Sequence, residues 1–356
     1  MSLKEFRQDL LDHLLSFLWR QWSAMGVLGA SSSEEEWIID PEPLLVFSLE
    51  MARYEPRLFD EILAWLEVNG RSLDSARLRR IIQGRDERTV RVVGAALQYA
   101  ISQGAERKWK NLSKFCGSLY EKQPNADSLE PLFREKSGKP HPLALANTLD
   151  PNFSLFYLNR PKIKNLKKSR EVSVNARTNL RFLLRAMYST GAKSESILYL
   201  LTHDGGRPRD IADSVGLFWL GIHQALLDLS RSSLVQTRMK RKKVEYYLNQ
   251  NRWWEFLSPG DAENPVRPKW LNWIAIFSGL SSIWKTVDEL AAGGQSDYMR
   301  ASKLQESLDI VAAEFARAGH DISRLPSAGL PPDLHQKLAL RFIGDIFSVK
   351  EQTTSV

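Results

Sequence analysis

The stretch that most constrains the fold runs from residue 180 to residue 259. In its most informative part, residues 206–259, two short helical patterns precede two strand-like runs. The first helical pattern ends near Val215, and the Gly216 that follows can take a positive φ that other residues resist. The second helix is expected over residues 218–230, with apolar side chains spaced to form one buried face. These side chains are Ile222, Leu226 and Leu229. The chain is therefore predicted to form a helix, a tight turn and a second helix.

Two runs of alternating residues follow the second helix. LVQTR at 234–238 and KVEYYLN at 243–249 alternate with the period of a β-strand, and residues 239–242 are expected at the turn between them. A β-hairpin is therefore predicted, with a cluster of basic residues at and beside its turn. The cluster consists of Arg238, Lys240, Arg241, Lys242 and Lys243. Such a cluster suits contacts with phosphate groups.

This order of helix, turn, helix and basic hairpin resembles the winged helix-turn-helix module of ArsR- and MarR-like transcriptional regulators of bacteria and archaea. The resemblance covers residues 175–258, about a quarter of the chain. It implies that the second helix enters the major groove of double-stranded DNA, and that the hairpin, or wing, contacts the DNA backbone. The side chains expected at the DNA are Arg207, Arg209, Trp219, His223, Gln224, Arg238, Lys240, Arg241, Lys242 and Lys243.

The first turn of the second helix departs from the pattern of these regulators. Helices that read bases usually carry polar side chains there, whereas this turn is Phe218, Trp219, Leu220 and Gly221. An apolar first turn can contact thymine methyl groups, and it can equally dock on protein. Two functions therefore stay open. One is a DNA-binding regulator, and the other is an interaction protein whose winged helix fold presents Phe218, Trp219 and Leu220 to a protein partner.

The chain as a whole is predicted to be mainly α-helical, and its 356 residues indicate two or three domains. Helical periodicity predicts an N-terminal domain over residues 1–107 and a C-terminal region over residues 259–350, and the latter is a candidate for homodimer formation. Residues 108–174 are rich in proline and are expected to be a connector with some ordered pieces. Outside the winged module, helices are expected at residues 3–22, 41–51, 58–68, 73–82, 87–103, 269–290, 298–318 and 334–347.

Charge is unevenly distributed along the chain. The formal net charge is +7, but residues 1–70 hold 5 Lys and Arg against 13 Asp and Glu. The basic remainder is therefore the part expected to meet an anionic partner such as nucleic acid. Its densest run outside the hairpin is RPKIKNLKKSR at 160–170, with six positive charges and no negative one. Such a run is either a solvated linker or an arm that contacts phosphates.

Catalytic and metal-binding motifs are not found in the sequence. The single cysteine, Cys116, excludes an intrachain disulfide and a cysteine-rich zinc site, and it fits a reducing cytoplasm. The six histidines have no HxH or HxxxH spacing, and no P-loop, dinucleotide-binding or nucleophile-elbow motif occurs. The most hydrophobic run, residues 270–284, is short for a membrane span. We therefore expect a cytoplasmic protein without enzymatic activity, cofactor, metal or membrane segment.

Overall fold

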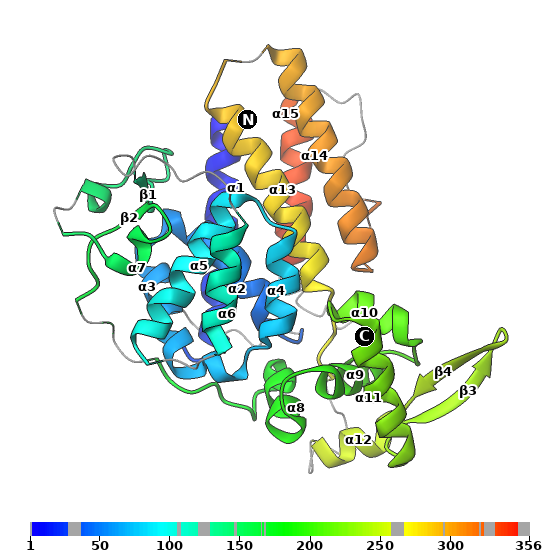
Figure 1. The fold of residues 1–356 in the computed structure, drawn as a ribbon. Coiled ribbons are helices and arrows are strands. Elements are labelled where there is room, and N and C mark those ends of the chain that lie inside the picture. Colours follow the sequence, from blue (N-terminus) through cyan, green and yellow to red (C-terminus); the bar gives the residue numbers. More distant parts are fainter. Residues whose placement is uncertain are drawn as a thin grey trace, which may run out of the picture.

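The computed structural model is mainly helical and contains two small two-stranded sheets among the residues that it describes (Figure 1). These residues are 2–27, 37–104, 108–119, 129–145, 148–164, 166, 169–257, 267–294, 296–319, 322–323 and 332–347. The predicted fold class, mainly α, is confirmed at this level. Within the same ranges, no helix has both the length and the apolar character needed to cross a membrane.

The N-terminal helices form the larger of two hydrophobic cores. They are α1 (Leu3–Ala24), α2 (Pro41–Met51), α3 (Pro56–Asn69), α4 (Ser75–Gln83) and α5 (Glu87–Ser102), with short 3-10 turns at Ala52–Tyr54 and Gly70–Ser72. All residues of α2 are buried, because α1, α4 and α5 pack around it. Its start at Pro41 suits a residue without a backbone N–H. The predicted helices at 3–22, 41–51 and 87–103 are confirmed.

Residues 108–174, expected to be a connector, contribute side chains to the same core. They contain α6 (Lys108–Ser118), α7 (Pro151–Ser154) and two parallel strands, β1 (Glu130–Pro131) and β2 (Leu158–Asn159), with a 3-10 turn at Pro142–Leu145. Phe133 and Phe153 are buried against the ring of Phe59 in α3. The core therefore continues across the expected boundary at residue 107. Prolines keep the elements here short, but they do not prevent aromatic side chains from packing.

The basic run at 160–170 begins inside this core. Arg160 is buried, pairs with Asp60 at 2.9 Å, and lies within 5.7 Å of the ring centres of three phenylalanines. This first charge of the run is therefore structural. The run also contains Lys162, Lys164 and Arg170, which are exposed, and Lys167 and Lys168, which lie outside the described residues.

The C-terminal helices complete the larger core. They are α13 (Trp273–Ala291), α14 (Asp297–Arg317) and α15 (Pro332–Phe347). Helix α13 packs along α14 and α1, and α15 packs against α1 (Figure 1). The apolar stripe of α14 is buried within the chain and includes Leu308, Val311 and Phe315. The side chains that suggested a homodimer contact are therefore covered by the chain itself.

The first C-terminal helix begins later than expected. It was predicted from residue 269, but α13 starts at Trp273, where the side chain of Asn272 accepts a hydrogen bond from the N–H of Ala275. Lys269 instead lies in an extended segment and forms a parallel β-bridge with Trp37. An N-cap and a bridge to a distant segment together override the helical pattern of these residues.

The remaining elements surround a second, smaller core. They are α8 (Leu180–Tyr188) after a 3-10 turn at Arg177–Asn179, α9 (Ala192–Thr202), α10 (Pro208–Val215), α11 (Trp219–Arg231), β3 (Gln236–Lys240), β4 (Lys243–Tyr247) and α12 (Gln250–Leu257). Ile222, Leu226 and Leu229 of α11 are buried in this core, as predicted. Gly216 joins α10 to α11 with a φ of 73°, and a Cβ there would lie 2.4 Å from Ile274. Only glycine meets both conditions.

A buried cluster of six charged residues joins the two cores. We call it the junction cluster, and it consists of Asp40, Glu42, Arg77, Arg181, Arg185 and Glu195. Glu42 pairs with Arg77 at 2.6 Å and with Arg185 at 2.7 Å. Arg77 also donates from Nε to the carbonyl oxygen of Val215 at 2.6 Å, at the end of α10. Three positive and three negative charges balance in this buried site, and the hydrogen bond from Arg77 of α4 ties the cluster to the end of α10.

Candidate nucleic-acid interface

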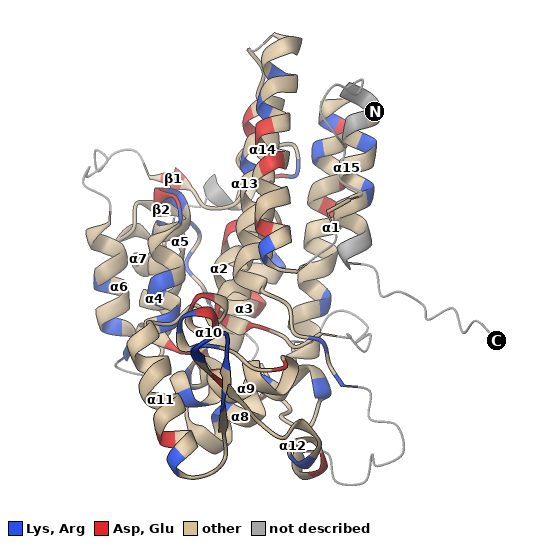
Figure 2. Cartoon of the chain, turned by 90° about the vertical axis from the view of Figure 1, so that its right-hand side faces the viewer, with Lys and Arg blue, Asp and Glu red and all other residues tan. Residues whose placement is uncertain are grey.

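The basic residues 238–243 lie on an antiparallel hairpin that projects from the smaller core (Figure 1), and Figure 2, in which this side faces the viewer, colours Lys and Arg residues blue. Strands β3 and β4 pair from Gln236 and Tyr247 to Lys240 and Lys243. The turn is therefore only Arg241 and Lys242, and the prediction of a turn over residues 239–242 was too long. Positive φ angles at both central residues allow this tight connection.

The hairpin is anchored to the start of α10 through Gly206. This residue exchanges two backbone hydrogen bonds with Tyr246 of β4, each 2.9 Å long. A Cβ at position 206 would lie 2.8 Å from Ile211 and 2.9 Å from Tyr199, so a side chain does not fit there. The close approach of two backbones therefore fixes the direction of the hairpin relative to α10.

The hairpin turn places two basic residues in the left-handed region. Arg241 has a φ of 50° and Lys242 a φ of 62°. Two-residue hairpin turns of this kind normally use Asn and Gly. A residue with a Cβ loses roughly 1–2 kcal/mol in this region relative to its preferred conformations. Side chains kept at such a cost are often functional.

The basic residues of the hairpin differ in how far they are engaged by the protein. Arg238 pairs with Glu245 at 2.6 Å and donates to the carbonyl oxygen of Asp204 at 2.8 Å, so its predicted contact with DNA competes with contacts inside the module. Its hydrogen bond lowers the pKa of the Glu245 carboxyl. Lys240 lies 3.5 Å from the same carboxylate. Arg241, Lys242 and Lys243 are exposed, and no carboxylate of the described chain forms an ion pair with them.

Trp219 is the first residue of α11 and lies on its exposed face. The guanidinium of Arg209 is 5.7 Å from its ring centre, and the ring of His223 is 6.1 Å away. Three predicted site residues are thus brought together by α10 and α11. Gln224 lies one turn further along α11 and donates to Asp228 at 3.0 Å. Arg207 is half-buried at the N-cap position of α10.

The apolar first turn of α11 meets the N-terminal helices at a contact that sequence reasoning missed. Arg80 of α4 lies 5.3 Å from the ring centre of Phe218 and donates to the carbonyl oxygen of Leu217. Arg80 belongs to the sequence ARLRRII at residues 76–82, within α4. This local cluster of basic residues was the sequence signal from which a contact of α4 could have been suspected. Its distance from α11 in the sequence concealed the contact.

Cys116 and His203, which lie outside this surface, are engaged in packing. The described chain contains no group of three His, Cys, Asp or Glu side chains that could hold a metal ion. Cys116 is buried in the larger core, and burial raises the pKa of its thiol to about 12, so the thiol is protonated at neutral pH. His203 stacks on Tyr199 with ring centres 3.8 Å apart, and burial lowers the pKa of its imidazole.

No family model, curated protein or solved structure matches the chain.

Proposed function

We propose that the chain binds double-stranded DNA through a winged helix-turn-helix formed by residues 175–258, and that it acts as a transcriptional regulator without catalysis or a cofactor. In this proposal α11 faces the major groove and the β3–β4 hairpin is the wing. Phosphate contacts come from the tip of the wing, and base contacts come from the face around Trp219 and His223. The tip residues are Lys240, Arg241, Lys242 and Lys243.

The observation that carries the proposal is the pair of basic residues in the left-handed turn of the hairpin. Asn and Gly would adopt these angles at a lower conformational cost. The presence of Arg241 and Lys242 therefore favours a role for their charges. Lys240 and Lys243 pair directly beside them, so four cations gather at the end of a narrow ribbon. A DNA duplex, with one negative charge per about 1.7 Å of its axis, is a fitting partner for such a tip.

Base reading is expected to contribute less than backbone contacts. Gln224 can read adenine with both amide atoms, but its side-chain amide is bonded to Asp228. Trp219 offers an apolar surface, which suits a thymine methyl group and does not distinguish the other bases. We therefore propose that binding has a strong salt dependence and a modest preference among DNA sequences.

A second candidate function is protein docking on the first turn of α11. Phe218, Trp219 and Leu220 are 67%, 48% and 64% exposed. Neighbouring exposed apolar side chains of this size are typical of interaction surfaces. In this alternative the winged module presents an apolar patch to a protein partner, and the charges of the hairpin tip do not determine affinity.

Binding of the full chain to a random-sequence duplex at several salt concentrations tests the DNA proposal. The test variant combines Lys240→Ala, Arg241→Ala, Lys242→Ala and Lys243→Ala. Each lost phosphate contact should reduce the slope of log affinity against log salt by about one unit. We expect a slope reduced by up to about four units, together with a large loss of affinity at low salt.

A matched control changes four exposed lysines remote from the hairpin. It combines Lys4→Ala, Lys139→Ala, Lys303→Ala and Lys337→Ala. Both variants lose the same net charge, so an equal loss in both would mean unspecific attraction without a wing. If the wild-type chain shows no salt-sensitive affinity for any duplex, the DNA proposal is wrong. Loss of a protein partner by a Trp219→Ala, Leu220→Ala variant would then favour the docking alternative.

A further inference from the structure

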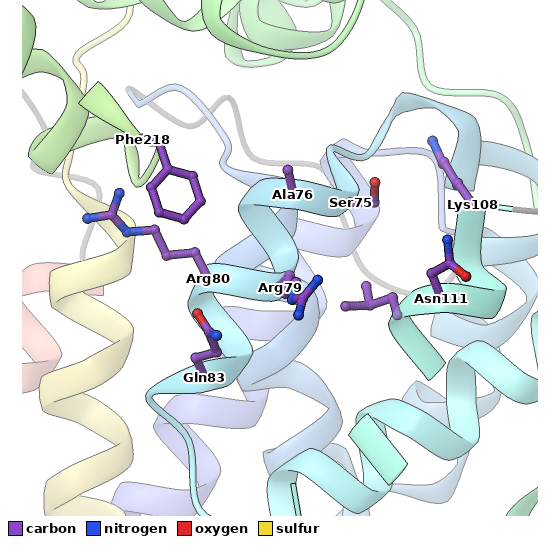
Figure 3. Close-up of a pocket in the computed structure, with 9 residues that line it drawn as sticks. Ser75, Ala76, Arg79, Arg80, Gln83, Lys108, Asn111 and Phe218 are labelled. Atoms are coloured by element: carbon purple, nitrogen blue, oxygen red, sulfur yellow. The ribbon is translucent and has the colours of Figure 1, made fainter. Parts of the chain in front are cut away.

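A pocket of about 510 Å³ lies between α4, α6 and the first turn of α11 (Figure 3). We call it the α4–α6 groove. Helix α4 supplies Arg79 and Arg80, α6 supplies Lys108 and Asn111, and Phe218 forms the end next to α11. The N-terminal helices therefore form a concave surface that adjoins the proposed DNA-binding module.

The walls of the groove carry an excess of positive charge. Of the described residues that line the groove, three are cations and none is acidic. Arg79 lies over the ring of Phe115 at 4.2 Å, and no described carboxylate pairs with it. Arg80 forms an ion pair with Asp213, and the distance between its guanidinium and the carboxylate is 3.9 Å. A concave surface of one sign of charge concentrates anions.

The cations of the groove are held in place by the protein. Lys108 donates from Nζ to the carbonyl oxygens of Arg71 and Leu73, at 2.9 Å and 3.0 Å. Arg80 donates to the carbonyl oxygen of Leu217, which precedes the N-cap residue of α11. These contacts use acceptors on neutral backbone groups, so the positive charges of both side chains are not neutralised by them.

The cations form a row across α4. Figure 3 shows Lys108 and Asn111 at one side, Arg79 in the middle, and Arg80 with Phe218 at the other side. A row of charges along a groove matches an extended polyanion better than a compact ion. The row ends at Phe218, where the exposed face of α11 starts. A strand that lies along α11 can therefore continue over α4.

We infer that the α4–α6 groove binds a backbone phosphate of the DNA strand beside the segment that α11 faces, with Arg79 as the principal contact. This inference rests on the proposed function, because it takes DNA as the source of the phosphate. An arginine guanidinium offers two parallel N–H donors to phosphate oxygens, and Asn111 and Ser75 add neutral donors. A free phosphorylated small molecule would offer the same chemistry, and the experiment below separates the two sources.

Duplex binding by single variants of the full chain tests the inference. Arg79→Ala should reduce the salt slope by about one unit, so that the loss of affinity between about 50 and 200 mM salt becomes about fourfold smaller. Arg79→Lys keeps the charge and should restore most of the slope. The matched control is Lys110→Ala, which removes an exposed cation of α6 that does not line the groove. Equal melting temperatures will show that these variants remain folded.

Equal slopes for Arg79→Ala and Lys110→Ala would overturn the inference. If the hairpin variant still loses slope in that case, the proposed function stands and only the inference fails. Calorimetric titration with inorganic pyrophosphate gives the second arm. Pyrophosphate binding that depends on Arg79, without an effect of Arg79 on the DNA slope, assigns the groove to a free phosphorylated ligand and also overturns the inference. A wild-type chain without duplex affinity overturns the inference and the proposed function together.

Discussion

The junction cluster and the hairpin tip both contain basic side chains, but these are buried in the cluster and exposed at the tip. Arg77, Arg181 and Arg185 are buried, and each bonds at least one of the three carboxylates of the junction cluster. Arg241 and Lys242 are exposed and form no ion pair within the described chain. The matched charges of the junction cluster hold two cores together, whereas the unmatched charges of the tip remain available to an anion outside the protein.

The electrostatics of the junction cluster explain why its carboxylates stay charged although they are buried. Burial alone would raise the pKa of Glu42, but the charges of Arg185 and Arg77 outweigh burial and hold this pKa well below its usual range. The pKa of Glu195 is lowered in the same way, by Arg181 and Arg185 against the effect of burial. Both glutamates are therefore ionised at neutral pH, and they depend on their arginine partners to remain so.

The largest expected effect comes from breaking the junction cluster. Glu42→Ala leaves Arg77 and Arg185 with one carboxylate fewer in a buried site. Removal of one partner from a buried ion pair typically costs about 3–5 kcal/mol, and we expect a loss of this size in the free energy of unfolding. Urea titration followed by tryptophan fluorescence measures it.

The control for this prediction is an exposed ion pair. Arg71 and Glu171 lie 2.9 Å apart, but their side chains are 65% and 73% exposed. Arg71→Ala should lower the free energy of unfolding by about 0–1 kcal/mol, since water solvates both groups. A loss for Glu42→Ala no larger than the loss for Arg71→Ala would contradict the structural role of the cluster.

The helices and the hairpin could be predicted because local patterns mark them. Gly216 ends α10, and apolar residues three and four apart mark the buried face of α11. The surface groups around Trp219 could also be predicted, since residues on the opposite face of an amphipathic helix point outward. These features depend only on neighbours in the sequence.

Contacts between distant segments could not be predicted in this way. Arg77 belongs to a basic helix and has the pattern of a solvated face, yet it is buried against Asp40, Glu42 and the end of α10. No periodicity marks partners that are more than 30 residues apart. The engagement of Arg238 was predictable in principle, because a two-residue turn places it directly opposite Glu245.

The pH dependence of stability should distinguish the buried charges from exposed ones. A carboxyl whose pKa is lowered by folding binds fewer protons in the folded state, so its contribution is present above the unfolded pKa, near 4.5, and is lost as the pH falls further. The difference in unfolding free energy between the wild-type chain and Glu42→Gln should be about 1.5–3 kcal/mol at pH 7, the value of a hydrogen bond to a charged group. This difference in unfolding free energy should shrink as the pH falls below the unfolded pKa of the carboxyl.

Urea titrations of both proteins between neutral pH and pH 3 measure this change. The matched control is Glu171→Gln, because Glu171 is exposed and pairs only with a side chain in water. Its difference from the wild-type chain should stay near zero across the range. A difference for Glu42→Gln that is independent of pH would mean that folding does not lower the pKa of Glu42.

The smallest expected effect on stability comes from a change at the hairpin turn, which should stabilise the fold and weaken DNA binding. Lys242→Gly removes a side chain from a left-handed position, so the folded state loses strain of roughly 1–2 kcal/mol. The greater freedom of glycine in the unfolded chain offsets part of this gain. We expect a net increase in the free energy of unfolding of about 0.5–1 kcal/mol. The same change removes one cation, and the salt slope of duplex binding should fall by about one unit.

Lys243→Gly is the matched control for the hairpin tip, because Lys243 carries the same charge but lies in β4 without a positive φ. Glycine in a strand weakens it, so this variant should be less stable while its salt slope falls by the same amount. The two variants together separate the charge of the tip from its conformation. If Lys242→Gly gains stability and keeps the full salt slope, the charge at the turn does not contact DNA. The contrast between the buried and the exposed cations would then reflect solvation alone.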